Sequence, residues 1–264
     1  MILRRVNPYH LSPVIRTIIL SAIAGLPLSA FCNPAAGGAS EIIERTATLR
    51  SLFAAEQIER LATVLPPDRE VRWRVRVPKH TAPAGVLVFV SPANDATLKA
   101  DWPAVLDDKH LIWIAAQEFG NSVPSNQRML AALMALTLVQ QNYAVDSSRV
   151  YISGMSGGGR IASMTITLFP NLFTGALYIV GADFWTTTEP ALLALITDKR
   201  YVFLTGAKDF NRNEMRQVYR RYLDAGARHS LLMDLPRFGH EYPNARALDT
   251  AIQFLDADHI STRK

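Results

Sequence analysis

The sequence of 264 residues predicts one α/β domain, with a mostly parallel sheet and helices on both faces. Several short runs are almost continuous in valine, isoleucine, leucine and phenylalanine, as expected for strands buried on both faces of a parallel sheet. Helical stretches separate these runs, and this alternation is typical of α/β domains with right-handed crossovers. Apolar residues make up 49% of the chain, which is enough to bury one large core.

The expected elements follow one another to the end of the chain. Residues 41–65 come first and combine helical spacing of isoleucine, leucine and alanine with interleaved charges, so we expect a helix there. The apolar runs then predict seven strands, at 71–77, 85–90, 111–116, 150–153, 176–180, 201–205 and 231–235. Further helices are expected at 124–142, 157–168, 190–196, 213–225 and 244–255. About twenty residues separate the strands at 176–180 and 201–205, which leaves no room for a large lid domain.

The first 32 residues are expected to be a signal peptide. Three arginines lie around the apolar run from Thr17 to Cys32, and no acidic residue precedes Glu41. The run is shorter than the ~20 residues that span a bilayer comfortably, although an uncleaved membrane anchor is the alternative. We therefore expect a signal peptide at 1–32, a linker at 33–40, one domain at 41–264, and a secreted or periplasmic protein without stable membrane insertion. Cleavage would remove the only cysteine and lower the net charge from +5 to +2, so the basic balance does not indicate nucleic-acid binding.

A serine on a tight turn is the first candidate for chemistry. Gly154 to Gly158 match G-x-S-x-G, with Ser156 at the centre. A β-rich run leads into this motif and a helical stretch follows it, which is the setting of a nucleophile elbow. In such an elbow the backbone N–H of Gly157 is placed to donate to an oxyanion. The alternative is an ordinary glycine-rich turn between a strand and a helix.

An acid and a base follow the serine in the chain order that is usual for enzymes with a nucleophile elbow. Asp209 comes just after the strand at 201–205, and His240 follows the strand at 231–235. A serine hydroxyl needs a base to take its proton, and that base needs an acid to fix its tautomer. We therefore expect Ser156, His240 and Asp209 to act together. Asp183 and Glu189 are rival acids, and Asp209 has the alternative role of a solvated loop carboxylate or helix cap.

At these residues the chain resembles the polyhydroxybutyrate-depolymerase and feruloyl-esterase branch of the secreted α/β-hydrolases. The likeness is clearest at 143–173, where Y-A-V-D-S-S-R-V-Y-I-S-G-M-S-G-G-G leads to the segment F-P-N-L-F. The resemblance implies the α/β-hydrolase fold and hydrolysis of carboxylic esters through an acyl-enzyme, with the same three residues and no metal or organic cofactor. Members of that family place a His-Gly pair where this chain has Ser91 and Pro92. Proline has no N–H to give, so we expect Ala93 to supply the second oxyanion donor, with Asn94 as a further candidate.

Four aromatic residues are expected to form an apolar wall for the substrate: Phe184, Trp185, Phe210 and Tyr242. The alternative is that they only pack the loops around the site. The sequence thus predicts an exported serine esterase that acts on a small-molecule or polymer-derived ester. An acyltransferase or peptidase with the same triad, or a non-catalytic binding protein, are the alternatives.

Overall fold

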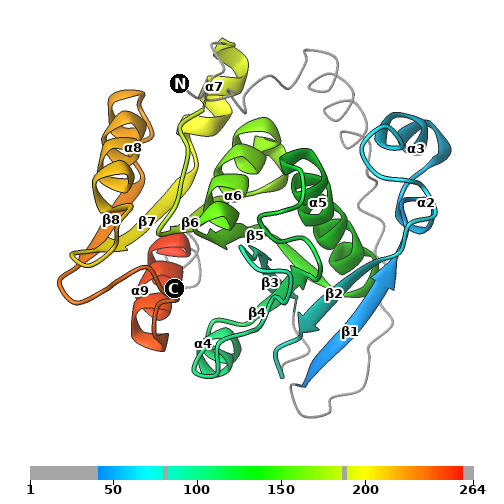
Figure 1. Ribbon diagram of the computed structural model, residues 1–264, viewed down its shortest axis with the longest axis horizontal. Coiled ribbons are helices and arrows are strands. Elements are labelled where there is room, and N and C mark those ends of the chain that lie inside the picture. Colours follow the sequence, from blue (N-terminus) through cyan, green and yellow to red (C-terminus); the bar gives the residue numbers. More distant parts are fainter. Residues whose placement is uncertain (1–40, 80–82, 186–188, 258–264) are drawn as a thin grey trace, which may run out of the picture.

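An eight-stranded sheet forms the centre of the molecule (Figure 1). The computed structural model describes residues 41–79, 83–185 and 189–257. The strand order is β1-β2-β4-β3-β5-β6-β7-β8, and all neighbouring pairs from β4 to β8 are parallel. β2 is antiparallel to both of its neighbours, β1 and β4. The strands are β1 (Ile42–Ala47), β2 (Val71–Arg76), β3 (Ala84–Val90), β4 (Leu111–Ala116), β5 (Val145–Met155), β6 (Gly175–Ile179), β7 (Arg200–Gly206) and β8 (Ser230–Leu235).

Helices cover both faces of this sheet (Figure 1). One face packs against α5 (Ser125–Asn142), α6 (Gly157–Leu168) and α8 (Arg212–Asp224), and the other against α4 (Pro103–Asp108) and α9 (Ala245–Leu255). The shorter elements are α2 (Leu49–Leu52), α3 (Ala55–Leu61), α7 (Pro190–Thr197) and a 3₁₀ turn, η1 (Pro170–Leu172). None of the helices in the described ranges is long and apolar enough to cross a membrane.

The central strands are buried on both faces, as the apolar runs predicted. Every residue of β3 is buried, and successive side chains enter opposite cores. Val86 and Val88 pack with α5 and α6, whereas Leu87 and Phe89 pack with α4 and α9. Because successive side chains of a strand point to opposite faces, the sheet has one apolar layer on each of its two faces.

The expected helix at 41–65 was wrong in its first part. Residues Ile42–Ala47 form β1, whose side chains alternate in exposure as expected at the edge of a sheet. Two isoleucines and a threonine favour extended backbone there, and β2 offers an open edge for antiparallel pairing. Helix begins only after Thr48, whose side chain caps α2 by accepting a hydrogen bond from the Ser51 N–H.

The other predicted elements agree with the structure to within a few residues, except that β5 begins earlier, at Val145, and α4 was not anticipated. β6 ends at Ile179 and β7 begins at Arg200, and this interval holds α7 rather than a lid domain. The expected signal peptide and linker lie outside the described residues. Because β5 to β8 are parallel, the carboxyl ends of β5, β7 and β8 lie at the same edge of the sheet, where their loops can meet.

Candidate active site

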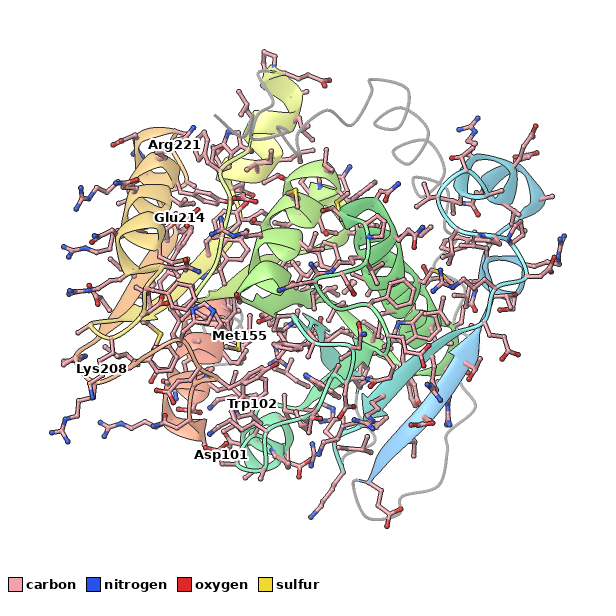
Figure 2. All side chains as sticks on the ribbon, in the orientation of Figure 1. Asp101, Trp102, Met155, Lys208, Glu214 and Arg221 are labelled. Atoms are coloured by element: carbon pink, nitrogen blue, oxygen red, sulfur yellow. The ribbon has the colours of Figure 1, made fainter. Side chains whose placement is uncertain are left out.

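Ser156 occupies the turn between β5 and α6. Its backbone has φ 55° and ψ −122°, a left-handed value of φ that a residue with a side chain rarely adopts. Such a conformation costs about 1–3 kcal/mol and persists only where the surroundings impose it. The Ser156 N–H donates to the Ile179 carbonyl of β6 at 2.8 Å, and the Ser156 carbonyl accepts from the Arg160 N–H. Figure 2 shows the preceding residue, Met155, near the middle of the sheet.

The glycines two before and two after the serine are required by close backbone contacts. A Cβ atom added at Gly158 would lie 2.0 Å from the Val90 carbonyl oxygen, and one at Gly154 would lie 2.3 Å from the Gly158 oxygen. Both distances are far below any real contact, and the obstructing atoms belong to the backbone. The sequence pattern therefore has a steric cause, as expected for a strand–turn–helix elbow.

The structure brings His240 and Asp209 to this serine. The His240 Nε2 atom lies 2.9 Å from Ser156 Oγ, and Nδ1 lies 2.8 Å from Asp209 Oδ1. Asp209 is 5% exposed and accepts two further hydrogen bonds, from the Thr205 hydroxyl at 2.6 Å and from the Asn211 N–H at 3.0 Å. The carboxylate is therefore a buried, oriented group that faces the imidazole, and not a solvated loop residue.

The rival acids lie elsewhere. Asp183 pairs with Arg160 at 3.0 Å, and the same guanidinium makes two hydrogen bonds to Glu214 on α8. Hydrogen bonding to Glu214 is the main reason why the pKa of Arg160 is raised. Glu189 is an exposed residue with extended backbone at the N-terminal cap of α7. The structure therefore places neither rival acid against His240.

The two expected oxyanion donors are in different situations. The Gly157 N–H follows the nucleophile at the start of α6 and meets no acceptor within the described residues. The Ala93 N–H donates to the Ser91 hydroxyl at 3.0 Å, so it is already engaged. The Asn94 side chain is engaged only as an acceptor, since its Oδ1 accepts from the Gly120 N–H at 3.0 Å. The donor expected from the turn after β3, the Ala93 N–H, is thus already engaged, whereas the amide N–H groups of Asn94 donate in none of these contacts.

Of the four expected aromatic wall residues, Phe210 alone presents a largely exposed ring at His240. It is 78% exposed and stacks on His240 with the ring centroids 3.9 Å apart. Phe184 and Trp185 stack on each other and pack against Tyr222 of α8, and Trp185 is 7% exposed. Tyr242 packs against two aromatic rings, those of Phe89 and Trp102. For these three residues the packing alternative describes their contacts better.

Sequence reasoning missed Arg128, a buried cation behind the site. Its guanidinium donates to the Ser91 carbonyl at 2.9 Å and to the Phe119 carbonyl at 3.1 Å, and reaches the Gly157 carbonyl at 3.5 Å. It is 5% exposed, and no carboxylate pairs with it in the described part of the chain. Burial lowers the pKa of Arg128 to about 10, so it remains charged at neutral pH. The available signal was a lone arginine immediately before the apolar run at 129–136.

Comparisons with known proteins agree with this architecture. The model of the prolyl oligopeptidase family matches residues 130–232, which include the elbow and the segment carrying Asp209. An esterase of the fungus Rhizomucor miehei superposes with a TM-score of 0.62 at 13% identity, covering 100% of this chain and 94% of that one. The fold is that of the α/β-hydrolases.

Two further solved structures extend this likeness. A ferulic acid esterase gives a TM-score of 0.59 at 12% identity, with coverage of 82% of this chain and 98% of that chain. S-formylglutathione hydrolase from Staphylococcus aureus gives a TM-score of 0.55 at 14% identity, with coverage of 81% of this chain and 94% of that chain. No curated protein matches the chain. The polyhydroxybutyrate-depolymerase side of the expected resemblance is not among these findings, so the comparisons support the hydrolase fold and not that branch.

Proposed function

We propose that this protein is a serine hydrolase that cleaves carboxylic esters through an acyl-enzyme, with Ser156 as the nucleophile, His240 as the base and Asp209 as the acid. The observation that carries the proposal is the unbroken chain of contacts from Ser156 Oγ to His240 Nε2 and from His240 Nδ1 to Asp209. The strained backbone of Ser156 supports it, since a nucleophile elbow requires that conformation. The fold shared with several esterases supports it further.

The reaction follows from the positions of the three side chains. Ser156 Oγ bonds to the ester carbonyl carbon while its proton passes to His240 Nε2, and the carbonyl electron pair becomes an oxyanion. Collapse of this intermediate breaks the bond to the alcohol oxygen, which takes the proton from His240 and leaves. Water then attacks the acyl-enzyme in the same way and releases the acid. Asp209 keeps the imidazole in the required tautomer and stabilises its protonated form.

Hydrolysis of p-nitrophenyl esters from acetate to decanoate tests the proposal. We expect activity in the wild type that disappears in Ser156→Ala and in His240→Ala, and fluorophosphonate labelling of the wild type but not of Ser156→Ala. The preferred chain length would measure the acyl site. A wild-type protein that neither hydrolyses any ester in the series nor reacts with the probe would overturn the proposal and favour a non-catalytic binding protein.

Peptide cleavage is the second candidate, favoured by the match of residues 130–232 to the prolyl oligopeptidase family. The same triad serves ester and amide hydrolysis, and one fold hosts many activities. Aminoacyl and peptidyl p-nitroanilides distinguish the two. Preference for these amides over the matched p-nitrophenyl esters would assign a peptidase. Transfer of the acyl group to an added alcohol in place of water would assign an acyltransferase.

Export and substrate type are further proposals. The basic and apolar character of residues 1–32 supports a cleaved signal peptide and a secreted or periplasmic enzyme. The exposed ring of Phe210 beside His240 supports an ester with an apolar or aromatic group close to the scissile bond. N-terminal sequencing of the protein recovered from outside the cytoplasm tests the first, and comparison of feruloyl with acetyl esters tests the second.

A further inference from the structure

An oxyanion normally receives two or more hydrogen bonds, and the turn after β3 is ill placed to give one. Pro92 has no N–H, and the Ala93 N–H is held by the Ser91 hydroxyl. Ser91 is buried, with 3% of its surface exposed, so water does not easily replace its hydroxyl as the acceptor of this hydrogen bond. Gly157 N–H is therefore one donor, and, apart from the amide groups of Asn94, a second has to come from another element.

The segment after β4 lies against both parts of the oxyanion site. The Asn121 N–H donates to the Pro92 carbonyl at 2.9 Å, and the Gly120 N–H donates to the Asn94 side chain at 3.0 Å. The Glu118 N–H donates to the Asn94 carbonyl at 2.6 Å. Three hydrogen bonds thus fix this segment to the turn after β3, and they hold the backbone of Asn121 in place.

The side chain of Asn121 lies on the residue that follows the nucleophile. A Cβ atom added at Gly157 would lie 2.2 Å from Asn121 Oδ1, 2.8 Å from Cγ and 3.0 Å from Nδ2. The carboxamide therefore occupies the space that a side chain at position 157 would fill. This explains why the residue after the serine is a glycine, although G-x-S-x-G leaves that position open.

The amide nitrogen of Asn121 is close to the Gly157 N–H and is not otherwise used. A Cβ atom lies about 2.5 Å from its own backbone nitrogen, so Nδ2 is within about 5.5 Å of the Gly157 nitrogen. One oxygen atom can lie within hydrogen-bond distance of two donors at that separation. Asn121 is exposed, and the two polar atoms of its side chain have no hydrogen-bond partner in the described ranges.

We propose that the Asn121 carboxamide is the second oxyanion donor, giving a hydrogen bond from Nδ2 to the tetrahedral intermediate beside the Gly157 N–H. The inference rests on the proposed esterase function and deepens it. It assigns to a side chain on the loop between β4 and α5 a task that the sequence suggested for a backbone amide after β3. Asn121 touches the oxyanion only when the carbonyl becomes tetrahedral, so it lowers the barrier without tightening substrate binding.

The test compares Asn121→Ala and Asn121→Asp with the wild type in p-nitrophenyl ester hydrolysis. Loss of one oxyanion donor costs about 10²–10³-fold in kcat, so we expect a fall of that size with KM changed by less than about threefold. The aspartate has the same shape but no N–H and adds a negative charge, so it should be at least as damaging as alanine. Ser122→Ala changes the exposed neighbour and serves as the matched control, with wild-type kcat.

A second readout separates catalysis from structure. A trifluoromethyl ketone adds to Ser156 and leaves an oxyanion in the site, so its Ki should rise in both variants by about the factor lost in kcat/KM. Thermal unfolding should be unchanged, because the carboxamide is exposed. Variants with kcat within about threefold of the wild type, or an unchanged Ki for the ketone, would overturn the role of Asn121 and leave the esterase proposal standing. A wild type inactive on every ester would overturn both.

Discussion

We expect the substitution Arg128→Met to damage catalysis much more than it damages stability. The guanidinium of Arg128 joins the Ser91 carbonyl, in the turn after β3, to the Phe119 carbonyl, in the loop after β4. These two segments carry the groups that surround an oxyanion. Methionine fills similar volume without donating to either carbonyl, so the change removes the connection and leaves the core packed.

The change in the free energy of unfolding is a small difference between two opposing effects. Two hydrogen bonds from a charged donor are worth about 1.5–3 kcal/mol each, and both would be lost. Burial that lowers the pKa of Arg128 from 12.5 to about 10 means that the charged form costs about 3 kcal/mol to hold inside the protein, and methionine removes that cost. The free energy of unfolding should therefore fall by only about 0–3 kcal/mol.

The catalytic effect has no such compensation. A shift by 1 Å of the loop after β4, which carries Asn121, can cost about 10²-fold in rate because the oxyanion donor loses its alignment. Urea unfolding and p-nitrophenyl acetate hydrolysis measure the two effects on the same preparations. Arg128→Lys keeps the charge but not the forked geometry, so its kcat should lie between those of the wild type and Arg128→Met. The reasoning is refuted if Arg128→Met keeps kcat within about threefold of the wild type, or if it loses more than about 5 kcal/mol of stability.

Three other outcomes are expected. Asp209→Asn should lower kcat by about 10³–10⁴-fold, because it favours the wrong imidazole tautomer. Asp183→Asn should keep most of the activity, since Asp183 pairs with Arg160. Equal losses of kcat in the two variants would contradict the assignment of Asp209 as the acid. Phe210→Ala should raise KM for aromatic esters and leave thermal unfolding unchanged, since the ring is mostly exposed; an unchanged KM would contradict substrate contact. The hydrogen bond from Lys99 holds the pKa of Asp101 below its usual value, so its stabilising effect is present above about pH 4 and is lost at lower pH. The difference in urea midpoint between the wild type and Asp101→Asn should therefore shrink from pH 7 to pH 3, and an equal difference at both would contradict this.

The sequence predicted the central elements because their signals are local. Buried parallel strands are continuous apolar runs, and the elbow has its own glycines, so both could be identified without knowing their neighbours. β1 was missed because its identity depends on pairing with β2, which lies about thirty residues later in the chain.

The surroundings of the serine were harder to predict for the same reason. Trp185 is covered by Tyr222 of α8, and the Ala93 N–H is engaged by a side chain, and neither contact leaves a pattern in the sequence. Asn121 and Arg128 have the same character, since each acts on a loop that is distant in the sequence. Contacts of this kind become visible only when the chain is folded.

The glycines around Ser156 have a consequence for changing this protein by design. Their nearest neighbours at Gly154 and Gly158 are carbonyl groups of the main chain, which are the same whatever the surrounding side chains are. These two glycines are therefore required whichever side chains surround them, and they offer no position at which selectivity can be adjusted. Variation in what the protein accepts has to come from side chains that face the serine from neighbouring loops, such as the exposed Phe210. A library at that position would sample new selectivity while leaving the elbow and the Asn121 carboxamide undisturbed.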